Sequence, residues 1–152
     1  GTLGDYNEET LAQFRSNGLT PEATSLQQLI EVFEGVGGYD LYSTLDCENV
    51  YEEFTLEFIQ ETLANDTPII VGWNDWGGHW QTIIGYDTMG TENENDDVFL
   101  VADSYDTTDH NQDGYGIYPA ERLMYNFTMY GAFPESEGGS DMLFLVASPS
   151  AK

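Results

Sequence analysis

The chain has 152 residues, 40% apolar and 14% aromatic, which is enough for one folded domain with a core and excludes a disordered chain. It carries 28 acidic side chains against 3 Lys and Arg, and its net charge of −25 repels phosphates, so we expect no nucleic-acid partner. No segment approaches the roughly 18 consecutive apolar residues of a membrane span, so we expect no membrane insertion.

The first half of the chain is predicted to be mainly helical. Three helices are expected, each with an apolar face at helical spacing. Asn7 can cap the first, Thr24 or Ser25 can cap the second, and Thr55 is expected to start the third. The second helix is expected to end at Gly35, followed by a turn over residues 37–39. The stretch around Cys47 has no clear pattern.

After Pro68 the pattern changes to β-strands, which are expected at residues 69–73, 79–86, 98–102 and 142–146. Residues 93–97 form an acidic loop between the second and third strands. Pro119 is expected to open a short helix over residues 120–127. Helices first and antiparallel strands afterwards predict an α+β fold with segregated layers, in one domain over residues 1–152.

One segment combines a His with two preceding glycines. His79 follows Gly77 and Gly78 at the start of a predicted strand, where the glycines allow substrate or other backbone to approach closely. Asp103 ends the next predicted strand, 24 residues later, a separation that suits two adjacent antiparallel strands. Its carboxylate can then accept a hydrogen bond from the imidazole and fix the tautomer. From spacing alone, a structural His–Asp pair is the simpler interpretation.

The residues around this pair add a resemblance. Residues 77–81 (Gly-Gly-His-Trp-Gln), 83–87 (Ile-Ile-Gly-Tyr-Asp) and 102–106 (Ala-Asp-Ser-Tyr-Asp) resemble the bacterial cysteine peptidases that trim bacteriocin leaders, and their papain-like relatives. The resemblance extends over about residues 5–147 and implies a papain-like cysteine proteinase fold. Ser104 stands where the family usually has Pro, which leaves the acid in place.

The resemblance also implies a function. It implies a secreted thiol peptidase that needs no cofactor and hydrolyses a peptide bond of a peptide or protein substrate by Cys-His-Asp acyl transfer. His79 would activate the thiol and Asp103 would orient His79. We therefore expect an extracellular or cell-surface protein, a setting that an acidic surface also suits. Apart from the resemblance, Trp76, Gly77 and Gly78 are candidates for substrate contact, because the glycines allow close approach and Trp76 can line a cleft; packing of the Trp side chain in the core is an equal alternative.

The family's nucleophile has no match here. In the family, a Cys-Gly-Pro segment begins a buried helix after a Gln that helps to form the oxyanion hole, and this sequence has no such segment. Cys47 lies between Asp46 and Glu48, whose charges raise the pKa of a thiol. Three explanations remain: the Cys lies upstream of this chain, Cys47 or an unrecognised residue serves, or the nucleophile has been lost.

A nucleophile that is lost, or that lies upstream of this chain, has consequences for the domain. Loss of the nucleophile would leave a non-catalytic, peptidase-derived extracellular domain that binds a partner. A domain without the nucleophile helix would expose an apolar groove, so we expect self-association, for example as a homodimer, unless another segment fills that groove.

A second candidate site lies in the acidic segment before Pro119. Asp109, Asn111 and Asp113 alternate and precede Gly114, as in the first half of a calcium-binding loop. The position at which a bidentate acid should close such a loop is occupied by Ala120. Calcium is therefore one candidate ligand, and a polar turn without a metal is the other interpretation.

Overall fold

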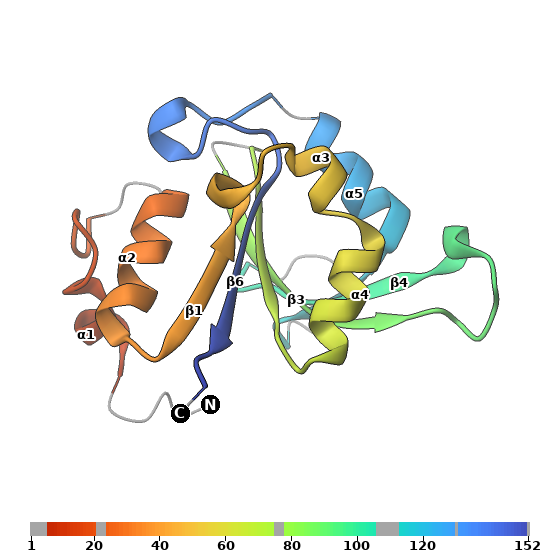
Figure 1. Cartoon of the computed structure of the whole chain (residues 1–152), viewed down its shortest axis with the longest axis horizontal. Helices are drawn as coiled ribbons and strands as arrows, with labels where there is room; N and C mark the ends of the chain where they lie inside the picture. Colours follow the sequence, from red (N-terminus) through yellow and green to blue (C-terminus); the bar gives the residue numbers. More distant parts are fainter. Residues whose placement is uncertain (1–5, 21–23, 75–77, 106–112, 130, 152) are drawn as a thin grey trace.

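The computed structural model describes residues 6–20, 24–74, 78–105, 113–129 and 131–151 (Figure 1). Its centre is a six-stranded antiparallel sheet with the order β1-β6-β2-β3-β4-β5, so β1 and β5 form its edges. The strands are β1 (Tyr39–Ser43), β2 (Ile69–Trp73), β3 (His79–Asp87), β4 (Val98–Ala102), β5 (Tyr115–Pro119) and β6 (Leu143–Pro149).

Within the described ranges, five helices and three short 3₁₀ turns accompany the sheet. The helices are α1 (Glu8–Ala12), α2 (Leu26–Val36), α3 (Val50–Glu53), α4 (Leu56–Ala64) and α5 (Ala120–Met129). The turns are η1 (Thr44–Asp46), η2 (Glu94–Asp96) and η3 (Glu135–Glu137). Two predicted N-caps are confirmed, because backbone N–H groups of the first helical turn donate to the side chains of Asn7 and Ser25. Thr55, predicted as the first residue of the third helix, is the N-cap of α4.

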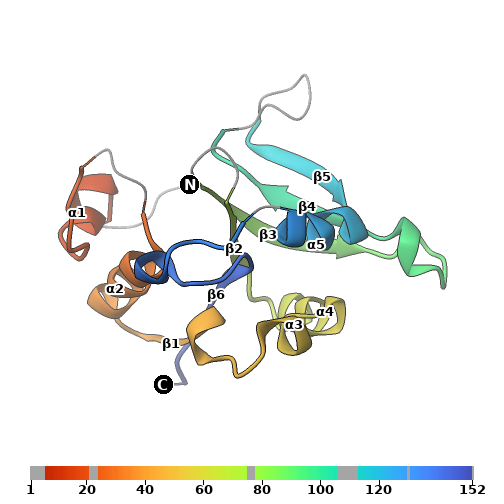
Figure 2. The same cartoon turned by 90° about the horizontal axis from the view of Figure 1, so that it is seen from above.

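The two faces of the sheet are covered by different helices (Figure 2). α2 packs on one face against β1 and β6, whereas α4 packs against β2 and β3 and α5 against β4 and β5. Strand β6 shows why both faces are apolar: Leu143 and Leu145 join the cluster under α2, while Phe144 and Val146 join the larger cluster under α4 and α5. Successive residues of a strand point to opposite faces, so β6 contributes to both clusters.

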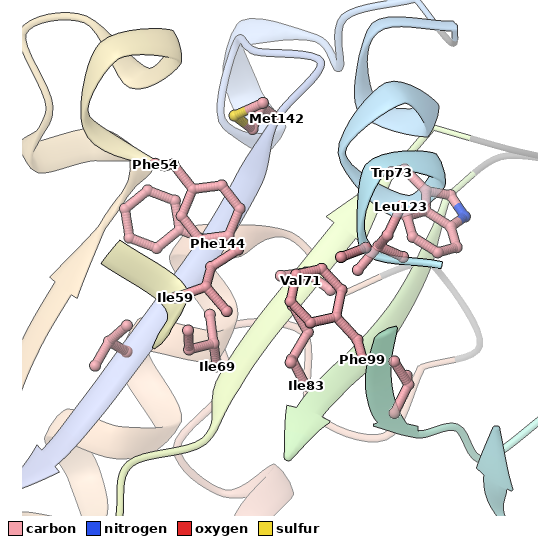
Figure 3. Packing of buried hydrophobic residues seen from close by; sticks show 13 residues of the cluster. Phe54, Ile59, Ile69, Val71, Trp73, Ile83, Phe99, Leu123, Met142 and Phe144 are labelled. Carbon is pink, nitrogen blue, oxygen red and sulfur yellow. The ribbon is translucent and has the colours of Figure 1, made fainter. Parts of the chain in front are cut away.

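The larger cluster is the main core of the molecule (Figure 3). Phe54 and Phe144 stack with ring centroids 4.4 Å apart and an interplanar angle of 10°. Ile59 of α4 and Leu123 of α5 pack with the strand residues of the same cluster and are fully buried. This packing holds β2, β3 and β4 together, which are the strands that position the candidate site.

The fold agrees with the predicted α+β class, and all four predicted strands are present. β2 and β4 have the predicted bounds, and α5 begins directly after Pro119 as expected. Two strands are additional: β1 occupies residues that the sequence assigned to a turn and to the undefined stretch, and β5 follows the acidic segment and ends at Pro119. α3 is a further helix of one turn. None of the helices in the described ranges has the length and apolar character needed to span a membrane.

Candidate active site

His79 and Asp103 meet at one end of two neighbouring strands. His79 is the first residue of β3, and Asp103 directly follows β4. Nε2 of His79 lies 2.7 Å from Oδ1 of Asp103, and the two side chains are 32% and 10% exposed. The predicted contact is therefore confirmed. When Nε2 carries the proton and donates to the carboxylate, Nδ1 is the basic nitrogen of the neutral ring, and it makes no hydrogen bond to any residue that the structure describes.

The Asp103 carboxylate has two further donors. The side-chain amide of Gln81 donates to Oδ2, and the backbone N–H of Tyr105 donates to Oδ1 at 2.9 Å. Burial raises the pKa of Asp103, but the hydrogen bonds from Gln81, Tyr105 and His79 outweigh burial and bring the pKa below its usual value. Asp103 is thus an ionised acceptor near neutral pH, as an orienting partner of an imidazole must be.

Gly78 adjoins this pair in a conformation that suits glycine. Its φ is 101°, and a Cβ at this position would lie 3.0 Å from the ring of Phe133. Gly78 and His79 border a pocket of about 210 Å³. Its other lining residues come from the segment before α2, from β3 and β6, and from the segments after β4 and α5: Thr24, Ser25, Trp80, Leu143, Ser104, Phe133 and Glu137.

The indole of Trp80 fixes one wall of this pocket. Its Nε1–H donates to the backbone oxygen of Thr24 at 2.8 Å, which connects β3 to the start of α2. Two other residues predicted to contact substrate, Trp76 and Gly77, lie outside the described residues. Gly78 is therefore the member of this predicted set whose position beside His79 is established.

Cys47 lies in a different part of the molecule. Its Sγ is 3.4 Å from the hydroxyl of Tyr42 and donates to the backbone oxygen of Ser43. Burial raises the pKa of the Cys47 thiol, and the charges of Glu53 and Asp46 add to the increase, so the predicted direction is correct although burial is the largest cause. Cys47 follows η1, at the end of β1. In the sheet, β1 is three strands away from β3, which places the two strands roughly 14 Å apart at the usual strand spacing. None of the described contacts of Cys47 is with His79.

The candidate calcium loop is described only at its end. Asp109 and Asn111 lie outside the described residues. Asp113 is exposed, and its Oδ1 accepts a hydrogen bond from the backbone N–H of Tyr115 at 3.1 Å, as in a polar turn. Within the described ranges, no group of three or more His, Cys, Asp or Glu side chains could hold a metal ion. Calcium binding stays a prediction.

Two neighbours of the His79–Asp103 pair, Gln81 and Tyr105, are not predicted from the sequence. Gln81 is 4% exposed and lies two residues after His79, on the same face of β3. The ring of Tyr105 lies 6.2 Å from that of His79, at 71°. The sequence gives no clear signal for Gln81, because a polar residue in a strand usually lies on the solvent face, and its burial is evident only from the packing around it. Tyr105 acts through its backbone, for which a side-chain pattern gives no signal.

Comparison with known protein families identifies a relationship over most of the chain. A model of the family described as the Peptidase_C39 like family matches residues 4–131. The matched region contains both residues of the pair, Gln81, and all strands except β6. No curated protein and no solved structure matches the chain.

Proposed function

Because this chain belongs to the Peptidase_C39 like family, we propose that it is a papain-like cysteine peptidase domain that hydrolyses a peptide bond. Membership in the family implies a papain-like fold and a peptide substrate. The observation that carries the proposal is the 2.7 Å contact between His79 and Asp103, at the ends of paired strands inside the matched region.

The proposed roles follow from the two nitrogens of His79. Nε2–H donates to Asp103, so Nδ1 faces the reaction as a base and takes the proton of a Cys thiol. The thiolate attacks the peptide carbonyl, and the imidazolium gives its proton to the leaving amine, which yields a thioester. Water then attacks the thioester, with His79 again accepting a proton, and releases the acid and the thiol. Asp103 stabilises the imidazolium in both steps.

The nucleophile is a Cys other than Cys47. The Sγ atom of Cys47 is hydrogen-bonded to the hydroxyl of Tyr42 and the backbone oxygen of Ser43, and the raised pKa of Cys47 keeps it a thiol near neutral pH. In the family that the sequence resembles, the nucleophilic Cys precedes the catalytic His in the chain, and we propose that the nucleophile of this protein lies upstream of residue 1. Trp76, Gly77 and Gly78 are proposed to contact the peptide next to the imidazole, because Gly78 lines the pocket beside His79.

A groove beside the site is a candidate position for the nucleophile segment. It lies between α1 and α2, has a volume of about 620 Å³ and reaches Ser104, next to Asp103. Its apolar lining residues are Leu11, Ala12, Leu19, Leu29 and Val32. We propose that the helix that carries the nucleophile packs here. The homodimer expected when this groove is empty, and the extracellular location, stay predictions.

The test uses the full-length gene product, including any residues before Gly1, in a Cys47→Ser background. A thiol-alkylating probe at pH 6 should label one Cys rapidly, because pairing with His79 keeps it ionised. His79→Ala should slow this labelling by about a hundredfold, the ratio between a paired thiolate and a free thiol at that pH. Asp103→Asn should slow it less. Mass spectrometry of the labelled peptide checks both expectations.

Two outcomes would count against the peptidase. Rapid labelling that survives His79→Ala would exclude the proposed ion pair. A full-length protein without any further cysteine would exclude the nucleophile and favour the non-catalytic binding domain. The matched control is His110→Ala, because it removes the other histidine of the chain and should leave the labelling rate unchanged.

A further inference from the structure

Gln81 is a polar side chain on the core-facing side of β3, in contact with Asp103. We propose that Gln81 is a positioning residue of the site, whose amide holds the Asp103 carboxylate in the orientation that presents Oδ1 to His79. The inference rests on the proposed function of the His79–Asp103 pair and adds a third residue that acts through Asp103.

The strand register places Gln81 for this contact. Thr82 pairs with Ala102, so Gln81 and Asp103 are the next residues of the two strands and their side chains share a face. The amide of Gln81 donates to Oδ2, whereas Oδ1 accepts from Nε2 of His79 and from the backbone of Tyr105. The two oxygens thus have different donors, and rotation of the carboxylate about its Cβ–Cγ bond would break all three hydrogen bonds.

Stability does not account for a Gln at this position. Its side chain is 4% exposed, it pairs with the buried Val71 on β2, and Ile83 follows it on the same face. Oε1 of Gln81 is buried and has no hydrogen-bond partner among the described residues. An unpaired buried acceptor destabilises the folded state, and an apolar side chain of the same length would avoid this penalty. The bond to Asp103 is the favourable contact that the amide provides.

The same bond favours the ionised carboxylate. Burial raises the pKa of Asp103, and among the hydrogen bonds that lower it the one from Gln81 has the largest effect. An ionised carboxylate can only accept, so the NH₂ group of Gln81 must face it. Asp103 then remains an acceptor for Nε2–H of His79, which keeps Nδ1 available as the base.

The experiment compares Gln81→Met with Thr82→Val in the full-length protein. Met has the length of Gln but cannot donate, and Thr82 lies next to Gln81 on the opposite face of β3. In Gln81→Met, ¹³C NMR should show that the Asp103 carboxyl group titrates at higher pH than in the wild type. The Nε2–H proton of His79 should exchange with solvent about tenfold faster, because its acceptor is less firmly held. Thr82→Val should change neither quantity.

A structural role would give a different result. If Gln81 serves stability alone, Gln81→Met should lower the urea midpoint and leave the two NMR signals unchanged, and this result would overturn the proposal. A Gln81→Met protein that does not fold would also overturn it. Gln81→Asn has an amide one methylene too short to reach Oδ2, so it should reproduce both NMR changes and gives an independent test.

These readouts require no turnover, so the two proposals can fail separately. If the NMR changes occur while thiol labelling survives His79→Ala, the peptidase role fails and the positioning of Asp103 by Gln81 stands. If labelling depends on His79 but Gln81→Met alters neither NMR signal, the peptidase role stands and the positioning role is wrong.

Discussion

Tyr86 secures a buried acid on the far end of β3 from His79. Its hydroxyl donates to the carboxylate of Asp97, which is 3% exposed and directly precedes β4. Burial of the phenol and this hydrogen bond raise the pKa of Tyr86 to about 12. The bond is present only while the phenol keeps its proton, so its contribution to stability depends on pH.

Replacement of Tyr86 by Phe should lower the free energy of unfolding by about 2 kcal/mol at neutral pH, because Asp97 loses a donor. Because the pKa of Tyr86 is higher in the folded than in the unfolded protein, its contribution to folding stability is fully present at pH values below the unfolded-state pKa of about 10. That stabilisation is lost as the pH rises through about 12. The difference in urea midpoint between wild type and Tyr86→Phe should therefore be constant below about pH 9 and shrink above about pH 10.

The control for this substitution is Tyr115→Phe, because Tyr115 is 49% exposed on the edge strand β5. It should leave the urea midpoint unchanged. A difference between wild type and Tyr86→Phe that stays constant into strong alkali would contradict the assigned bond to Asp97.

Among individual residues, the sequence predicts the His79–Asp103 pair but not the hydrogen-bond donors that hold the Asp103 carboxylate. His79 and Asp103 are predicted because each stands at the end of a recognisable strand and within a family motif. Gln81 is not predicted, since a polar residue in a strand usually marks the solvent face, and only the packing around it shows that it is buried. The donor at Tyr105 is a backbone group, whose direction depends on a turn that the sequence does not specify.

Thr44 joins two elements that are distant in the chain. It begins η1 directly after β1, is 8% exposed, and its hydroxyl donates to the backbone oxygen of Met142 at 2.9 Å. The same hydroxyl accepts from the backbone N–H of Phe144 at 2.9 Å. One side chain therefore satisfies two backbone groups at the start of β6 where β1 has ended.

Substitution of Thr44 by Val keeps the shape but leaves both backbone groups unpaired, and we expect a loss of about 2–4 kcal/mol in unfolding free energy. Thr44→Ser keeps the hydroxyl and loses one methyl group, so it should cost about 1 kcal/mol. Urea unfolding, with an unchanged dependence on denaturant concentration, measures both. Equal losses in the two variants would show that the hydroxyl does not contribute as described.

The elements missing from the prediction are those that depend on distant partners. β1 reads Tyr-Asp-Leu-Tyr-Ser and is mostly exposed at its start, so it lacks a continuous apolar signal and forms because it pairs with β6, Tyr39 opposite Pro149. β5 ends in Pro119, and a Pro usually argues against a strand. By contrast, β2 and β4 have strong local patterns and match the prediction at both ends.

The charge of the whole molecule gives a prediction about salt. A net charge of −25 makes the compact state repel itself. Among the described residues the one salt-bridge contact is His79–Asp103, which is an ion pair only when the imidazole is protonated, so screening removes few favourable contacts. Raising NaCl from about 0.1 to 1 M shortens the Debye length from about 10 to 3 Å. We expect the Tm, measured by circular dichroism, to rise by about 5 °C or more.

Parallel Tm measurements in CaCl₂ distinguish screening of charge from specific binding of calcium. If salt acts by screening, NaCl and CaCl₂ at matched ionic strength should give a similar Tm, whereas binding at residues 109–114 should make millimolar calcium more effective and the effect reversible by a chelator. A Tm that falls as NaCl is added would contradict the repulsion argument.

The net charge of −25 also affects how the edge strand β5 behaves toward other molecules. The strand reads Tyr-Gly-Ile-Tyr-Pro without a charged side chain, and Ile117 is 70% exposed. Edge strands commonly carry charges that prevent them from joining other sheets, and here the repulsion between whole molecules has to do so. Ions that strengthen the fold also shorten the range of that repulsion. Thermal stability and colloidal solubility should therefore change in opposite directions as salt is added.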